Sequence, residues 1–220
     1  PKTGLPLWEH SRANIKQHES FLQEFPLEDP KTDEVINWFC SLPLFLNFQN
    51  FRAIHACWAN SAIANLRRIN SAGIFSRDFY IKNHCQKNTI YFAIELITKG
   101  PEAKLPTKSF FTDKTGIHRK TSRLAWWRHE ARSWRDLSVS VPNPDLVPDL
   151  IFQAWETIEL YPKTAPPVFF GHYWMSFPPR IESANALCLD YSAGKDGPLV
   201  AYHFNPRMPE LHLKNLTYTS

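Results

Sequence analysis

Two histidines stand at the ends of short apolar segments that have the character of buried strands. His172 follows the run Val168-Phe169-Phe170 and a glycine, and prolines before the run keep a helix from entering it. His55 follows Phe51-Arg52-Ala53-Ile54, a second run with aromatic and β-branched residues. Imidazole is the commonest neutral ligand for divalent transition metals, so two that converge would supply half of a tetrahedral site or a third of an octahedral one. The alternative is a structural histidine hydrogen-bonded to a nearby loop.

Four segments, in this order, resemble the calcineurin-like metallophosphoesterases. They are Leu42-Pro43-Leu44-Phe45-Leu46, Arg52-Ala53-Ile54-His55-Ala56-Cys57-Trp58, Phe169-Phe170-Gly171-His172-Tyr173-Trp174 and Cys188-Leu189-Asp190-Tyr191-Ser192. The similarity is greatest to the bacterial branch related to serine/threonine phosphatases and diadenosine tetraphosphate hydrolases. It implies a two-metal hydrolase in which His55 and His172 both bind the second metal, with divalent manganese, iron or zinc as the cofactor.

The chain also departs from this family. The family's Asp-x-His, Gly-Asp-x-x-Asp-Arg-Gly and Gly-Asn-His-Glu motifs supply the first metal site, the bridging aspartate and the catalytic asparagine and histidine, and none of them occurs here. Leu7-Trp8-Glu9-His10-Ser11 resembles the stretch that follows the third motif. We therefore expect residues 1–220 to form a single domain, the C-terminal part of a metallophosphoesterase domain, with one metal's histidines and no catalytic residue that can be assigned.

Arg123 is the candidate substrate-binding residue. It precedes the pair Trp126-Trp127 at a place where the family resembled here carries an arginine, whereas position 125 is alanine where a second arginine is expected. A guanidinium beside a metal site holds two oxygens of a phosphorylated substrate in a fork, which lysine does not do. The alternative is an arginine stacked on an exposed tryptophan.

Composition narrows the remaining function classes. The chain has 220 residues, of which 43% are hydrophobic and 14% aromatic, enough for a folded core. The net charge of +4 and short basic clusters such as Arg67-Arg68 indicate a solvated surface, and nucleic acid is not an expected partner. The four cysteines form no Cys-x-x-Cys pair, which predicts free thiols and a cytoplasmic protein. No apolar run approaches the roughly 20 residues of a membrane span, so no membrane partner is expected.

Apolar periodicity and turn residues predict a mixture of helices and strands, and the resemblance implies an α/β (α+β) fold, a mixed β-sandwich flanked by helices as in the C-terminal part of a metallophosphoesterase. Helices are expected over 9–25, from Thr32 to before Pro43, and over 61–69, 88–98 and 149–161. The expected strands are a hairpin of 44–48 with 51–54, strands over 110–116 and 119–127, the central strand 168–170, and a closing hairpin of 186–191 with 199–204. The tail after Asn205 is predicted to be irregular.

The sequence thus predicts a metal-dependent phosphoesterase acting on a phosphoprotein or a dinucleotide polyphosphate, incomplete as given. The alternative is a non-catalytic, metallophosphoesterase-like binding module with Trp126, Trp127 and Trp134 as a surface anchor patch. Nucleic-acid binding through the basic and aromatic stretch ranks last. Substrate identity, metal identity and oligomeric state do not follow from the sequence.

Overall fold

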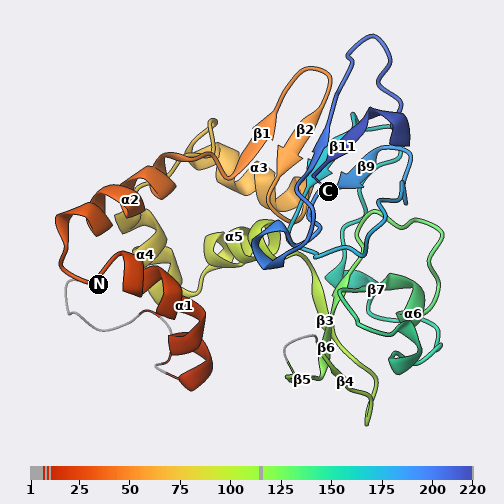
Figure 1. Ribbon diagram of the computed structural model, residues 1–220, viewed down its shortest axis with the longest axis horizontal. Coiled ribbons are helices and arrows are strands. Elements are labelled where there is room, and N and C mark those ends of the chain that lie inside the picture. Colours follow the sequence, from red (N-terminus) through yellow and green to blue (C-terminus); the bar gives the residue numbers. More distant parts are fainter. Residues whose placement is uncertain (1–6, 8, 10, 114–115, 220) are drawn as a thin grey trace. The chain divides into compact units, whose positions relative to one another are not determined.

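A computed structural model describes residues 7, 9, 11–113 and 116–219. Trp8 and His10 of the segment noted above, and Lys114 and Thr115 in the predicted strand 110–116, lie outside this range. The contacts between Cα atoms divide the chain into two compact units, residues 1–44 with 64–94 and residues 45–63 with 95–220. We describe each unit by itself, and the expectation of a single domain stays a prediction. The predicted α+β class is confirmed, because helices and several small sheets are both present (Figure 1).

The first unit is helical. It contains α1 (Arg12–Glu24), α2 (Pro30–Ser41) and α4 (Arg77–Gln86), with parts of α3 (Asn60–Ile69) and α5 (Thr89–Lys99). The Ser11 side chain caps α1 by accepting from Asn14 N, and Asp29 caps α2, whose first residue is a proline. Helix α4 was not predicted, because its apolar residues follow no helical period; Ser76 caps it. No helix in the described ranges is both long and apolar enough to cross a membrane.

The second unit is built on a four-stranded mixed sheet in the order β1-β2-β8-β9. Strands β1 (Phe45–Asn47) and β2 (Arg52–Ile54) form the predicted antiparallel hairpin. Strand β8 (Val168–Phe170) pairs in parallel with β2 on one side and with β9 (Ala186–Cys188) on the other. The three parallel strands therefore end at one edge of the sheet, where side chains from distant parts of the chain meet.

Three smaller sheets complete the second unit (Figure 1). The three-stranded sheet has the order β3 (Glu102–Lys104), β6 (Thr121–Leu124) and β7 (Ser138–Val139), and its neighbouring strands are antiparallel. Strands β4 (Phe111–Thr112) and β5 (His118–Arg119) pair with each other, as do β10 (Val200–Tyr202) and β11 (Leu216–Tyr218). The short helix α6 (Trp134–Leu137) precedes β7, and four 3-10 turns are Pro144–Leu146, Trp155–Thr157, Ala193–Lys195 and Leu213–Asn215.

Three predictions of secondary structure were wrong. The closing hairpin does not form, because β9 is buried along its whole length and pairs with β8 in parallel, while β10 pairs with β11 in the tail expected to be irregular. The helix over 149–161 is reduced to the turn Trp155–Thr157, because this segment hydrogen-bonds to another one: Trp134 N donates to Leu150 O and Phe152 N to Arg132 O. Strand 119–127 is interrupted at Lys120 and ends at Leu124.

The core of the second unit is aromatic. Trp126 and Trp127 are buried and stand edge to face, with ring centroids 5.4 Å apart, and both rings contact Phe170 of β8. Tyr173 completes the cluster and has no exposed surface. Edge-to-face packing of such large side chains fixes their positions as well as excluding water. The end of β8 is therefore held on a rigid base.

Asn185 anchors the loop that leads into β8. Its buried side-chain amide donates to the carbonyls of Pro162, Lys163 and Ala165, and the backbone carbonyl of Asn185 accepts from Val168 N at 2.9 Å. We predict that Asn185→Ala lowers the free energy of unfolding by about 2 kcal/mol, because buried carbonyls lose their donor. Chemical denaturation of both proteins measures this difference. The matched control is Gln153→Ala at an exposed position, and an equally small effect of both substitutions would contradict the prediction.

Candidate functional site

The two predicted histidines meet at the edge of the four-stranded sheet. His55 follows β2 directly, and His172 follows β8 after Gly171. Gly171 N donates to His55 O at 2.9 Å, which continues the parallel pairing past the ends of the strands. His55 Nε2 and His172 Nδ1 lie 3.2 Å apart. Their convergence is confirmed, and their role as metal ligands stays a prediction.

The loop that carries His172 has a strained backbone. His172 and Trp174 have φ angles of 74° and 49°, a left-handed conformation that is costly for residues other than glycine. Two hydrogen bonds hold the loop: Ser140 Oγ donates to Tyr173 O at 2.6 Å, and Met175 N donates to Asp190 O at 2.9 Å. Ser140 itself has a φ of 61°. Strain of this kind collects at functional sites, where the surroundings enforce it.

One indole ties the two histidine segments together. Trp126 Nε1 lies 3.1 Å from Ala56 O and 3.1 Å from the hydroxyl of Tyr173, and its N–H points to both acceptors. Ala56 follows His55, and Tyr173 follows His172. Trp126 is fully buried, so both bonds form away from water. The indole therefore sets the spacing of the residues directly after the two histidines.

Gly100 also lies against the hydroxyl end of Tyr173. Its φ is 78°, and a Cβ built on it would lie 2.1 Å from the Tyr173 hydroxyl, far inside van der Waals contact. Only glycine fits at this position. Sequence analysis did not find this role, because the signal, a glycine after a helix, has the same pattern as an ordinary helix end.

The surroundings keep both imidazoles neutral. Burial, as the largest cause, and the electrostatic effects of Arg123, His55 and Lys99 together lower the pKa of His172 to about 4. The pKa of His55 is also lowered by burial; the Asp190 carboxylate opposes this, and Arg123 adds to it. Neutral imidazole is the form that binds a metal ion. His172 Nε2 is buried and has no hydrogen-bond partner among the described residues.

Asp190 is a carboxylate near enough to His55 to affect its pKa. It follows β9, and a Cβ on Gly171 would lie 3.4 Å from its Cβ. Its Oδ1 accepts from Ser192 N at 2.9 Å, which fixes the side chain. Within the described ranges, however, no group of three or more histidine, cysteine, aspartate or glutamate side chains is arranged to hold a metal ion. The described residues thus offer two ring nitrogens at one point.

Arg123 lies next to the histidines but is not stacked on a tryptophan. From β6, its Nη1 donates to His172 O at 3.4 Å, and its Nε forms an ion pair with Glu102 at 3.6 Å. The alternative of an exposed Arg–Trp stack was wrong, because Trp126 and Trp127 are buried.

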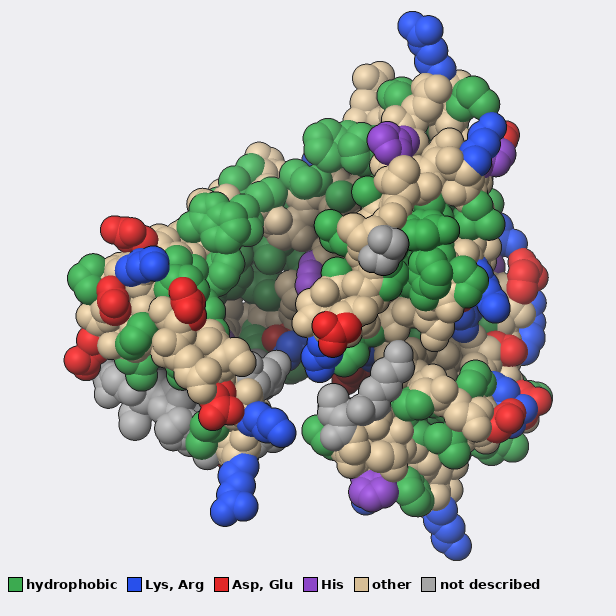
Figure 2. All heavy atoms as spheres, in the orientation of Figure 1, with side chains coloured by type: hydrophobic (Ala, Val, Ile, Leu, Met, Phe, Trp, Pro, Cys, Tyr) green, Lys and Arg blue, Asp and Glu red, His purple; other side chains and the backbone are tan. Residues whose placement is uncertain are grey.

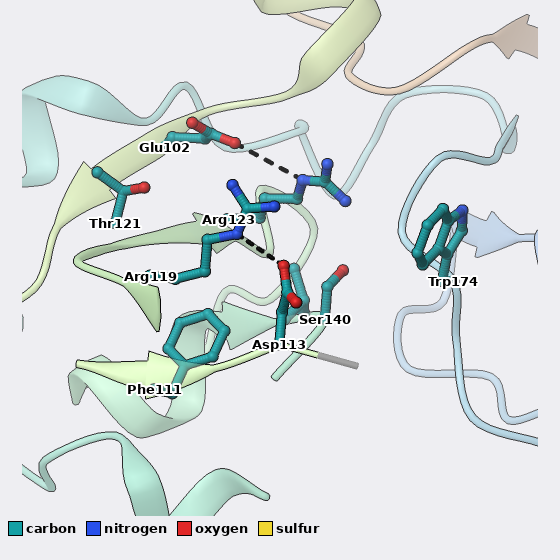
Figure 3. A pocket seen from close by; sticks show the side chains of 9 residues that line it. Glu102, Phe111, Asp113, Arg119, Thr121, Arg123, Ser140 and Trp174 are labelled. Atoms are coloured by element: carbon teal, nitrogen blue, oxygen red, sulfur yellow. Dashed lines mark hydrogen bonds and ion pairs between the residues drawn. The ribbon is translucent and has the colours of Figure 1, made fainter. Parts of the chain in front are cut away.

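Arg123 lines a pocket of about 170 Å³, which we call the Arg123 pocket (Figure 3). Arg119 and Asp113 form an ion pair inside it, with Arg119 Nε 2.7 Å from Asp113 Oδ2. Figure 3 shows the Arg123 side chain extending toward Trp174, which stands across the pocket. The pocket therefore offers guanidinium, carboxylate, hydroxyl and indole groups beside His172.

Comparisons with known proteins assign no family. No protein-family model, curated protein or solved structure matches this chain. The function is therefore argued from the residues of the site.

We predict that Trp126→Phe lowers the free energy of unfolding by about 2–4 kcal/mol, because Ala56 O and the Tyr173 hydroxyl both lose a buried donor. Tyr173→Phe should cost less, since Trp126 then keeps its bond to Ala56. The control is Trp155→Phe, which makes the same chemical change at a tryptophan that is 38% exposed. Denaturation curves test this order, and it fails if Trp126→Phe is no more destabilising than Trp155→Phe.

We predict that removing the charge of Arg123 and removing that of Asp190 change the pKa of the histidines in opposite directions. Arg123→Gln removes a positive charge and should raise the pKa of both histidines, whereas Asp190→Asn should lower the pKa of His55. NMR titration of the ring protons in metal-free protein measures both. Because the folded pKa of His172, about 4, lies below its ordinary 6.5, the unfolded chain binds a proton first, and stability falls as pH decreases between these values.

Arg123→Gln should therefore also weaken this loss of stability between pH 6.5 and 4. The matched control is Arg207→Gln, which removes the same charge from the exposed tail. Equal histidine pKa values in all four proteins would contradict the electrostatic account.

Proposed function

We propose that this protein is a metal-dependent phosphoesterase in which His55 and His172 hold one divalent metal ion. The observation that carries the proposal is the 3.2 Å separation of their ring nitrogens. Two nitrogens about 2.1 Å from one ion are about 3.0 Å apart in an octahedral site and about 3.4 Å apart in a tetrahedral one. The observed separation lies between these values, so the spacing of the two nitrogens is compatible with a shared ion, which would replace the hydrogen bond that now joins the two rings.

The electrostatics support the same role. Both imidazoles are neutral at pH 7, so binding a cation needs no proton to leave. Nitrogen ligands of this kind accept manganese, iron or zinc. When bound, a pair of such ions activates a hydroxide and polarises the phosphate for in-line attack.

Arg123 is placed to orient the substrate in this proposal. Its guanidinium is anchored by Glu102 and by the carbonyl of His172, so it is held close to the metal-binding ring. A fixed guanidinium binds two phosphate oxygens with defined geometry. The neighbouring Arg123 pocket would receive the part of the substrate that carries the phosphate, whether a phosphoprotein segment or a dinucleotide polyphosphate.

A two-metal reaction needs more ligands than two histidines. In this proposal the other ligands, including the bridging carboxylate, come from a segment outside this sequence. The rival function, a non-catalytic binding module, is favoured by one observation, that the described residues hold no third ligand in place. The anchor patch expected for that module was wrong: Trp126, Trp127 and Trp134 are at most 6% exposed and form part of the core.

Nucleic-acid binding receives no support from the face of the molecule that Figure 2 displays. Figure 2 shows lysine and arginine side chains interspersed with aspartate and glutamate on the face displayed, without a continuous basic area. A nucleic-acid site of useful affinity needs positive charge gathered along one surface.

We predict that His55→Ala and His172→Ala each lower the metal affinity of the protein at least tenfold, because each removes one of two ligands from the same ion. Equilibrium dialysis against Mn²⁺ or Zn²⁺ followed by elemental analysis measures the affinity. Phosphoesterase activity is assayed in parallel, on the chain and on any longer product of its gene.

The matched control is His203→Ala, since His203 is an exposed histidine of the same unit that directly follows β10. Unchanged metal stoichiometry and affinity in both site variants would remove the metal assignment. Metal binding that depends on both histidines, without phosphoesterase activity in the longer product, would favour the binding module.

A further inference from the structure

A second and larger pocket lies beside the histidine loop. Its volume is about 310 Å³, within the range of small-molecule sites. It shares Val139, Ser140 and Trp174 with the Arg123 pocket, so these three residues form a wall that the two cavities have in common. The residues after Trp174, from Met175 to Pro178, form another side. We call it the Arg180 pocket.

Its charged lining is mostly positive. Three arginines and one carboxylate line it: Arg128, Arg135, Arg180 and Glu182. Glu182 is already bound, because both its oxygens accept from Arg128 Nη2 at 2.8 Å. Those two charges therefore offset each other, and Arg135 and Arg180 remain as the cations available to a ligand.

The two remaining arginines differ in their partners. Arg135 Nε donates to Val147 O, and its Nη1 lies 3.7 Å from Asp145 and 3.9 Å from Asp149, both highly exposed. Such distant, solvated pairs hold a guanidinium weakly. Arg180 has neither an ion pair nor a side-chain hydrogen bond within the described part of the chain. An arginine at the rim of a cavity without an internal partner is suited to an external anion.

The uncharged lining supplies an apolar wall and one unsatisfied hydroxyl. Tyr173, Trp174, Phe177 and Tyr191 line the pocket, and the rings of Phe177 and Tyr191 meet nearly at right angles. Ser138 lines it as well, and its Oγ is buried without a hydrogen-bond partner in the described residues. A buried polar atom in this condition costs free energy unless a ligand or water satisfies it.

We propose that the Arg180 pocket binds a small organic anion, an oxyanion group attached to a planar apolar body. Arg180 and Arg135 would hold the oxyanion, and the aromatic wall would pack against the body. Phosphate monoesters, phosphonates and carboxylic acids share this chemistry. The site is separate from the histidine pair, so it does not depend on the phosphoesterase function; through Trp174 and Ser140 its ligand would touch the wall of the Arg123 pocket.

The test is calorimetry on the full chain in EDTA, so that no metal ion recruits the probe. Phenylphosphonate, which is not hydrolysed, carries both features of the ligand. Benzoate tests a carboxylate in place of the phosphonate, inorganic phosphate tests the anion without the ring, and benzyl alcohol tests the ring without the charge.

We expect phenylphosphonate to bind, and Arg180→Ala to weaken its binding about tenfold through loss of a charge-assisted contact. Arg207→Ala, the control with the same change in net charge, should bind like the parent protein. Tighter binding of phenylphosphonate than of benzoate would identify a phosphate-type ligand, and the reverse a carboxylate.

Three results would overturn the proposal. The first is that neither phenylphosphonate nor benzoate binds at about 10 mM. The second is that Arg180→Ala binds phenylphosphonate with the same affinity as the parent protein. The third is that inorganic phosphate binds as tightly as phenylphosphonate. Loss of binding in Arg123→Ala alone would place the probe in the Arg123 pocket and would also reject the Arg180 pocket. None of these outcomes bears on metal binding by His55 and His172, so the two proposals fail independently.

Discussion

The parallel pairing of β2 with β8 is the constraint on which the candidate site depends. Parallel strands start and finish at the same edges, so residues that follow two neighbouring strands must meet there. Gly171 N donates to His55 O and extends the pairing one step past the strands. This brings His55 Nε2 and His172 Nδ1 to within 3.2 Å of each other. An antiparallel arrangement of the same strands would have put the two histidines at opposite edges.

The buried aromatic cluster makes this meeting rigid. Trp126 bonds to the residues after both histidines, and Gly100 lies close against the hydroxyl of Tyr173. The cluster enforces positive φ angles at His172 and Trp174, which an isolated loop would avoid. The favourable packing of the cluster offsets the cost of this strain and holds the two imidazoles close together, as binding of a shared ion would require.

The wall formed by Ser140 and Trp174 organises the chemistry around the site. On one side, Arg123 and Arg119 line a pocket in which carboxylates hold both guanidiniums. On the other side, Arg180 lines a larger pocket and has no such partner in the described residues. The same wall therefore borders a charge-balanced cavity and a positively charged one. A ligand in either cavity would contact side chains of the strained loop beside His172.

The sequence by itself determined the two strand-ending histidines, the hairpin before His55 and most helices of the first unit, because apolar period, caps and prolines act locally. It also indicated Arg123 as a candidate substrate-binding residue, through its place before the paired tryptophans. It did not determine that those tryptophans are buried, that Gly100 closes on Tyr173 or that β9 joins β8, and it predicted a helix over 149–161 that backbone bonds to residues 132–134 replace. These features follow from contacts between residues distant in the chain, and local periodicity carries no information about which distant segment satisfies a given backbone or side-chain group.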